Sequence, residues 1–195
     1  MDKSRDEMGA RIARVKGKVL QWLAIVTEGQ CGEESLQECL TEEEMAEFER
    51  RSNVRLPEDY RRTLLEIMNG LEFESVAMEH GEPFFYPLVY TPDLDKPFPL
   101  TEPYEDGDYE DLYGDEDIRT RGALILCPDG CGADFYLIVT GPARGQVWHG
   151  DSSTGGPCLP RIDFLAWYEA CLDAGREDVG EIIFAGYDLD GNVRE

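Results

Sequence analysis

Residues Gly122 to Asp151 read GALILCPDGCGADFYLIVTGPARGQVWHGD, and this stretch decides the fold. It contains apolar runs at 123–126, 135–139 and 146–148, separated by short segments rich in Gly, Pro and Asp. Such separators contain residues that preset φ or permit positive φ, so each run is expected to turn back on the one before it. The stretch therefore predicts an antiparallel meander at the centre of the fold.

The middle run predicts a strand that is covered on both faces. Successive side chains of a strand point to opposite faces, and both sets are largely apolar here. One set is Phe135, Leu137 and Val139, and the other is Tyr136, Ile138 and Thr140. A sheet with this strand at its centre needs helices on one side and at least a loop on the other.

Helices are predicted on both sides of the meander in sequence. Residues 5–28 carry apolar side chains at spacings of three and four, which indicates an amphipathic helix. Thr41 to Glu44 has the form of a capping box, so a short helix should follow and end near Arg51. Further helices are expected from Pro57 to about Asn69-Gly70 and from Pro160 to about Ala174. Residues 71–90 read as one or two edge strands, 182–184 as a last short strand and 187–195 as a loose tail.

The composition excludes several classes of partner. Eighteen basic residues against forty-two acidic ones give a formal charge of −24. Nucleic acid and anionic membranes are unsuitable partners, because binding them depends on Lys and Arg. The charge instead favours solubility and electrostatically steered encounter with a basic protein. The first residues lack a signal-peptide core and no run is long enough to span a bilayer, so a cytoplasmic protein with six free thiols is expected.

Residues 91–117 differ in composition from the rest of the chain. They hold four prolines and eleven carboxylates against Lys96 as the one basic residue, so they cannot build a core of their own and predict a surface loop or partly disordered insert. One interpretation is a solvated loop, as charge runs usually are. The other is a strip that binds a basic protein, with aromatic side chains for contact area and carboxylates that imitate phosphates. The candidate residues of this strip are Glu102, Tyr104, Glu105, Asp106, Asp108, Tyr109, Glu110, Asp111 and Tyr113.

Three kinds of chemical site are not expected from the residues present. Cys127, Cys131, Cys158 and His149 supply only one close cysteine pair, where structural zinc usually draws on two. A catalytic Cys–His pair with His149 lacks an evident third group to orient the imidazole. Asp188 to Asn192 resembles the start of a calcium loop but has no Glu at the closing position. The prediction is a protein without catalytic residues, metal or cofactor.

The order of these elements resembles the SUKH superfamily, which includes yeast cell-wall synthesis regulators and many bacterial immunity proteins. The matching residues are Leu56, Pro57, Tyr60, Asn69-Gly70, Gly130 to Asp134, Gly141-Pro142, Gly145 to Trp148, Phe164-Leu165 and Trp167-Tyr168. The resemblance implies an α+β fold with helices packed on a central, mostly antiparallel β-sheet, over residues 41–175. Residues 1–40 would then be an N-terminal helical extension and 176–195 a C-terminal tail.

The resemblance also implies a function, by analogy of fold. Bacterial members neutralise secreted toxins by binding the toxin domain. The expected function is therefore a non-catalytic immunity protein that occludes a basic toxin effector domain. The alternative is an intracellular scaffold or regulatory domain that binds another protein.

Overall fold

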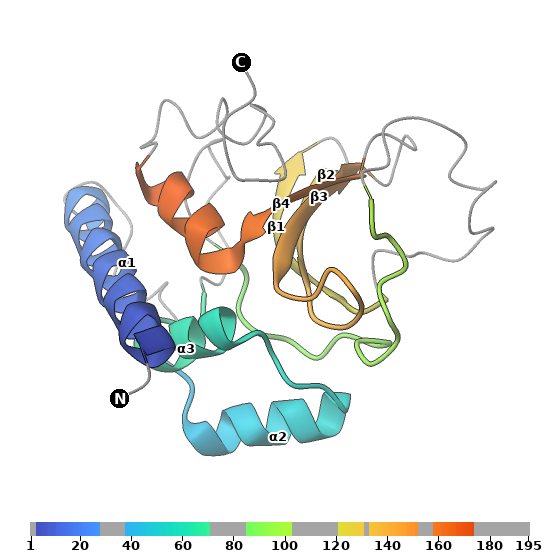
Figure 1. Ribbon diagram of the computed structural model, residues 1–195. Coiled ribbons are helices and arrows are strands. Elements are labelled where there is room, and N and C mark those ends of the chain that lie inside the picture. Colours follow the sequence, from blue (N-terminus) through green and yellow to red (C-terminus); the bar gives the residue numbers. More distant parts are fainter. Residues whose placement is uncertain are drawn as a thin grey trace.

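The computed structural model describes residues 3–27, 38–70, 85–102, 121–130, 133–151 and 158–173, and it confirms an α+β fold (Figure 1). The helices are α1 (Lys3–Thr27), α2 (Glu42–Ser52) and α3 (Glu58–Glu66). Residues 164–173 form a further helix. The strands are β1 (Ala123–Gly130), β2 (Ala133–Ile138), β3 (Gln146–Asp151) and β4 (Cys158–Asp163). They form one antiparallel sheet in the order β1-β2-β3-β4, which confirms the predicted meander and extends it by one strand.

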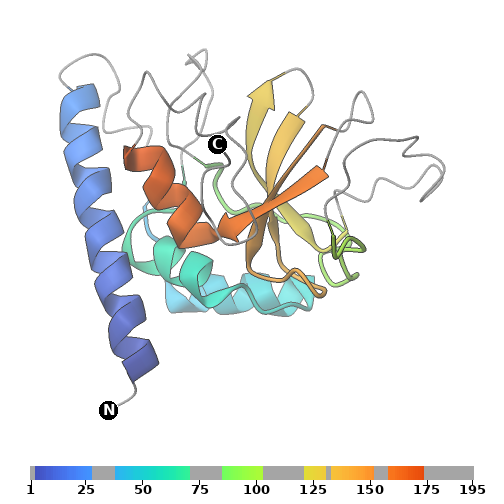
Figure 2. The same ribbon diagram turned by 45° about the horizontal axis from the view of Figure 1, so that its top comes forward.

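The sheet separates two apolar clusters, as the two-sided middle strand predicts. Phe135, Leu137 and Val139 join the larger cluster, which includes side chains of α1, α3 and the helix over 164–173. Tyr136 and Ile138 belong to a smaller cluster on the other face. Figures 1 and 2 show α1, α3 and the helix over 164–173 gathered on one side of the sheet. Covering both faces buries Phe135 to Ile138 of β2, and removal of these apolar side chains from water stabilises the sheet.

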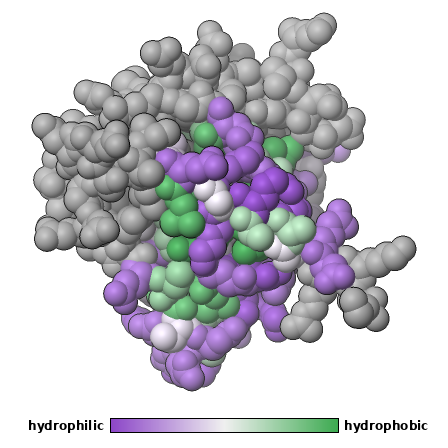
Figure 3. Space-filling model, turned by 90° about the vertical axis from the view of Figure 1, so that its left-hand side faces the viewer, coloured by the Kyte–Doolittle hydropathy of each residue, from purple (hydrophilic) through white to green (hydrophobic). Residues whose placement is uncertain are grey.

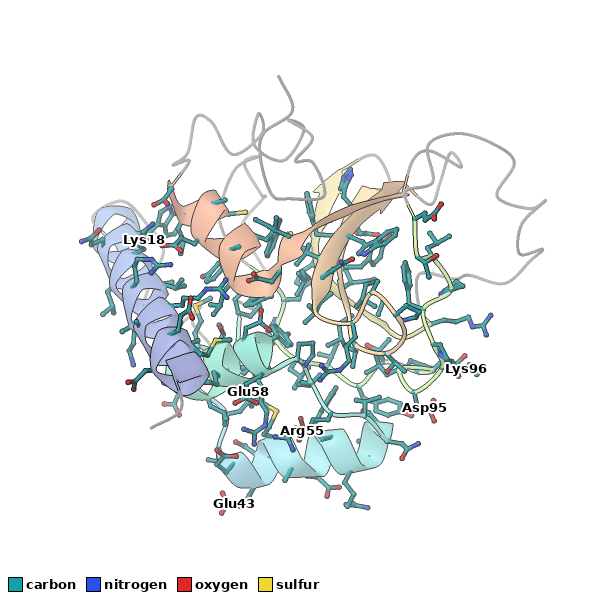
Figure 4. All side chains as sticks on the ribbon, in the orientation of Figure 1. Lys18, Glu43, Arg55, Glu58, Asp95 and Lys96 are labelled. Carbon is teal, nitrogen blue, oxygen red and sulfur yellow. The ribbon has the colours of Figure 1, made fainter. Side chains whose placement is uncertain are left out.

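The helix α1 packs against the domain through its predicted stripe. Ile12, Val15, Val19 and Trp22 are buried in the larger cluster. Beside this stripe, Arg11 pairs with Asp163, Arg14 with Glu169, and Lys18 with both Glu169 and Asp173. In Figure 4 the label of Lys18 lies between α1 and the helix over 164–173. None of the described helices is long and apolar enough to cross a bilayer.

This ion cluster should make the free energy of unfolding depend on pH in the acidic range. The hydrogen bond from Arg14 lowers the pKa of Glu169 from 4.5 to about 2. Partial burial opposes this shift, and Lys18 adds to it. A depressed folded-state pKa gives stability that is present above the unfolded pKa and lost as pH falls towards the folded one. Glu169→Gln should therefore lower the free energy of unfolding at pH 7, and its difference from wild type should shrink between pH 4.5 and about 2. Urea unfolding at a series of pH values measures this; a difference independent of pH would contradict it.

The segment from Cys158 differs from its prediction. Residues 158–163 form β4 rather than a loop and the start of a helix, and the helix begins at residue 164. An edge strand tolerates Pro160, which lies opposite Trp148, because only one side of an edge strand must donate to the sheet. Asp163, not Pro160, prepares the helix start: its Oδ1 accepts from the Ala166 amide at 3.0 Å.

Residues 85–90 are not a strand, which corrects the prediction for the described part of 71–90. Pro87 has no amide to donate, and the Leu88 amide donates to Asn69 Oδ1 at 3.0 Å instead of to a neighbouring strand. The Tyr86 amide donates to the carbonyl of Leu126 on β1. This segment is therefore held in place by single contacts at several points, and it forms one wall of the groove described below.

The first part of the acidic segment also differs from a simple surface loop. Leu94, Phe98 and Leu100 are buried, and the Phe98 ring packs edge-on against Trp148 with centroids 5.1 Å apart. The Phe98 amide donates to the carbonyl of Thr140 at 2.8 Å. Phe98 and Leu100 thus cover the second face of the sheet, whereas Leu94 joins the larger cluster. Apolar side chains between the carboxylates make these contacts, which the net composition of the segment does not reveal.

Candidate functional site

A shallow groove of about 460 Å³ lies between α2 and the irregular segment 85–90. Its lining combines apolar and charged side chains: Leu40, Glu43, Glu44, Glu47, Phe48, Arg51, Leu88 and Tyr90. Tyr90 is 49% exposed, and Val89 beside it is 63% exposed. Figure 3, which looks onto the side that carries α1, shows apolar surface in patches between hydrophilic ones. The groove is a place where apolar surface and carboxylates meet at the solvent boundary.

The capping box fixes the α2 wall of the groove. Thr41 Oγ1 accepts from the Glu44 amide at 3.2 Å, and Glu44 Oε2 accepts from the Thr41 amide at 2.9 Å. Met45 is buried beneath the helix, and Leu40 is tied to α3 because its amide donates to the Leu64 carbonyl at 2.9 Å. On a helix, residues three and four apart share a face, so Glu44, Glu47, Phe48 and Arg51 form one row. The start of the helix therefore sets which side chains face the groove.

The opposite wall is positioned by the end of the segment after α3. Gly70 has φ +79°, and a Cβ built on it would lie 2.6 Å from the Phe85 oxygen and from the Pro87 nitrogen. Only a glycine permits this approach of the two backbones. The Asn69 side chain holds the Leu88 amide, as noted above, so both residues of the Asn69-Gly70 pair place this wall.

The charges along the groove are unequal at its two ends. Glu43 and Glu44 lie in the first turn of α2, where the helix dipole favours carboxylates. Glu44 is used in the capping box, and its pKa is lowered by the hydrogen bond from the Thr41 backbone. Glu43 has no ion-pair partner among the residues that the structure describes, and in Figure 4 its label lies at the outer side of α2. The N-terminal end of the groove is thus acidic.

The other end of the groove carries a cation. The Arg51 guanidinium lies over the Tyr90 ring, 4.5 Å from its centroid. Such a contact holds the guanidinium against the aromatic face and leaves its edge N–H groups available for acceptors. The neighbouring Arg50 pairs with Glu47, about one turn earlier on α2, at 2.6 Å. The groove therefore runs from carboxylates at the start of α2 to a stacked arginine at its end.

The described basic side chains already have partners within the protein. Eight of them pair with carboxylates: Arg11, Arg14, Lys18, Arg50, Arg55, Arg61, Arg62 and Lys96. Lys16 and Arg144 donate to backbone carbonyls, Arg51 stacks on Tyr90, and Arg121 also has a contact. Each of these cations is thus paired or held within the protein. The net charge of −24 comes from the excess of carboxylates over basic side chains.

Of the predicted binding strip, only Glu102 lies among the described residues, and it is exposed. It follows the anchored part of the acidic segment, so the strip begins where residues 91–102 leave the second face of the sheet. The remaining strip residues lie outside the described part of the chain: Tyr104, Glu105, Asp106, Asp108, Tyr109, Glu110, Asp111 and Tyr113.

The cysteine and histidine alternatives draw on three neighbouring strands. The register places Cys127 opposite Phe135 and Phe135 opposite His149, so Phe135 stands between the two in the sheet. The Phe135 and His149 ring centroids are 4.7 Å apart. The side chains of Cys131 and Cys158 lie outside the described part, and among the described residues no cluster of three or more metal-ligating side chains occurs.

Of the described cysteines, Cys39, Cys127 and Cys171 are free thiols, as expected for these three. Burial raises the pKa of Cys171 to about 12. A thiol with so high a pKa stays protonated and is a poor nucleophile near neutral pH. The calcium-like residues 188–192 lie outside the described part of the chain.

Sequence reasoning did not identify the groove. Phe48 is partly buried: it packs against the larger core cluster and also lines the groove. Leu88 and Tyr90 were assigned to strands. The one available signal was the run from Thr41 to Arg51, in which carboxylates and arginines border two apolar positions.

Comparison with family models matches residues 39–160 to the SMI1/KNR4 family (SUKH-1). The matched range contains every residue of the groove as well as β1, β2 and β3. Comparison with curated proteins and with solved structures gave no match. Since the family model covers more than half of the chain, this protein belongs to the SMI1/KNR4 family (SUKH-1).

Proposed function

We propose that this protein is a SUKH-type immunity protein that binds a basic toxin effector domain and blocks it without chemistry. The observation that carries the proposal is the distribution of charge: each Lys and Arg whose side chain the structure describes is held by a partner within the protein, whereas the chain as a whole is at −24. A surface of surplus carboxylate attracts a basic domain and repels nucleic acid. Membership of the SMI1/KNR4 family supports a binding role.

A basic active site is a suitable target for such a surface. Toxin domains that act on nucleic acids need cationic surfaces to bind phosphates, and a carboxylate-rich protein can occupy those surfaces in place of the substrate. Inhibition then needs only steric and electrostatic occlusion. Such a protein needs no catalytic residue, metal or cofactor of its own.

A growth assay tests the proposed function. Each candidate basic toxin domain would be produced in a bacterial host with and without this protein. Growth arrest that is relieved by co-production supports an immunity role. A stable complex that leaves the arrest unrelieved would instead favour a scaffold or regulatory protein, and failure of any basic domain to bind would remove the proposal.

The acidic strip is assigned to the encounter step. Replacing Glu105, Asp106, Asp108, Glu110 and Asp111 with Asn or Gln should slow association with the basic partner by about tenfold at low salt, since steering by charge acts mainly on the association rate. The dependence of that rate on ionic strength should flatten at the same time. Stopped-flow association at several salt concentrations measures both; an unchanged rate at low salt would refute the role of the strip.

A further inference from the structure

We infer that the groove between α2 and residues 85–90 is a docking site for one large apolar side chain of the basic partner, flanked there by Lys or Arg. The inference deepens the proposed function and rests on it for the identity of the partner. The apolar floor comes from Leu40, Phe48 and Leu88, and the carboxylate of Glu43 stands at its rim. Apolar contact surrounded by a charged rim is the usual arrangement of an interface anchor.

The volume of the groove limits what it can hold. About 460 Å³ is at the lower end of small-molecule sites, but the groove is shallow and lies open along α2. It suits a leucine-sized or phenylalanine-sized side chain together with a few neighbouring backbone atoms. An extended or helical peptide segment can present such a side chain without entering a deep cavity.

Charge decides which segment occupies the groove. The acidic segment 91–117 of the same chain carries eleven carboxylates against one lysine, so Glu43 and Glu44 at the rim would repel it, while Glu47 is compensated by Arg50. A second copy of the chain would bring a further charge of −24. A segment rich in Lys or Arg has the opposite sign, gains from the same rim, and is the occupant that we assign.

The unequal ends of the groove give the occupant a polarity. Carboxylates at the start of α2 favour a cation at that end of the bound segment. Arg51, stacked on Tyr90 at the other end, offers N–H donors to a backbone carbonyl or a carboxylate. The bound segment should therefore place its basic residue beside Glu43, its apolar residue over Leu88, and an acceptor beside Arg51.

A pair of basic peptides tests the groove directly. The first is acetyl-Lys-Lys-Gly-Leu-Gly-Lys-Lys-amide, and the second has Ser in place of Leu. The methyl resonances of Leu40 and Leu88 in the full chain would be followed by NMR at 150 mM NaCl. The Leu peptide should shift both residues in a saturable way, at least fivefold more tightly than the Ser peptide. Equal binding of the two peptides, or shifts that leave Leu40 and Leu88 unchanged, would overturn the inference.

Two glutamates provide a matched pair of charge variants. Glu43 and Glu58 each lie exposed in the first turn of a helix, so changing either to Lys alters the net charge and the helix-dipole contact in the same way (Figure 4). Glu58 differs in a long, exposed ion pair with Arg55, at 3.9 Å, which contributes little to stability. Only Glu43 lines the groove. Glu43→Lys should weaken the Leu peptide about tenfold, and Glu58→Lys less than twofold. Equal weakening by both variants would mean that the peptide responds to net charge alone, which overturns the assignment.

The cognate partner separates this inference from the proposed function. Leu88→Ser should raise the dissociation rate of a neutralised basic domain about tenfold with little change in association rate, and Val89→Ser, outside the groove lining, should not. Thermal unfolding of both variants checks that they remain folded. A domain that still binds and is neutralised equally by both variants would remove the groove and keep the function. Peptide docking without neutralisation of any basic domain would keep the groove and remove the function.

Discussion

Replacing Gly70 with alanine is expected to destabilise the protein by roughly 3 to 4 kcal/mol and to displace one wall of the groove. The new Cβ would lie 2.6 Å from the Phe85 oxygen, the Pro87 nitrogen and the Tyr86 carbonyl carbon. These are backbone atoms, so no flexible side chain can move aside. The positive φ of +79° adds the strain of a left-handed conformation for a residue with a Cβ.

Gly145→Ala is the matched control for this prediction. Gly145 also has a positive φ, +91°, but a Cβ there would meet no atom within 4 Å. It should therefore cost only the conformational part, about 1 kcal/mol. Urea unfolding compares the two free energies, and the Leu88 methyl resonance should shift in Gly70→Ala alone. Equal destabilisation by the two substitutions would show that the close approach of residues 85–87 does not hold the wall.

The central sheet could be predicted from the sequence because its signals are local. The two-sided apolar run at Phe135 to Val139 and the glycine-containing turns on either side define β1, β2 and β3 without reference to other parts of the chain. The capping box at Thr41 is local too, and the structure contains both of its hydrogen bonds. Structural features that depend on a few adjacent residues can thus be predicted from the sequence.

The segments that differ from their predictions depend on contacts with residues distant in the sequence. Pro160 can begin a helix or sit in an edge strand, and the free edge of β3 decides for the strand. Leu88 lies outside any strand because Asn69, nineteen positions earlier, takes its amide. Phe98 is buried because Trp148 offers a surface on the far side of the sheet. None of these partners can be identified from the residues next to the segment.

The groove was missed for the same reason. Its two walls, α2 and residues 85–90, are about forty positions apart, and their approach depends on the single hydrogen atom of Gly70 in place of a side chain. The acidic strip, in contrast, was predicted from composition, which reports charge well and position poorly. The groove lining shows what composition does not, namely which apolar side chains gather at the surface beside α2.

Replacing Asp59 with alanine is expected to cost roughly 3 kcal/mol, because this buried carboxylate connects two helix starts. Its Oδ1 accepts from the Tyr60 amide at 2.9 Å, in the first turn of α3. Its Oδ2 accepts from the Leu165 amide at 3.4 Å, in the first turn of the helix over 164–173. Alanine would leave both buried amides without this acceptor, whereas Asp59→Asn keeps one acceptor oxygen and should cost about half as much.

The pH dependence of the Asn variant distinguishes this carboxylate from Glu169. Burial, which outweighs the amide hydrogen bonds, raises the pKa of Asp59 above its ordinary 3.8. A raised folded-state pKa gives stability that is fully present below the unfolded pKa and lost as pH rises through the folded one. The stability of wild type relative to Asp59→Asn should thus grow as pH falls from 7 towards 3.8, while that relative to Glu169→Gln shrinks below 4.5. Urea unfolding of the three proteins on one pH series measures both slopes. Opposite shifts of the two pKa values should produce opposite trends with pH. Parallel slopes for the two variants would therefore contradict a raised pKa for the buried Asp59 carboxylate.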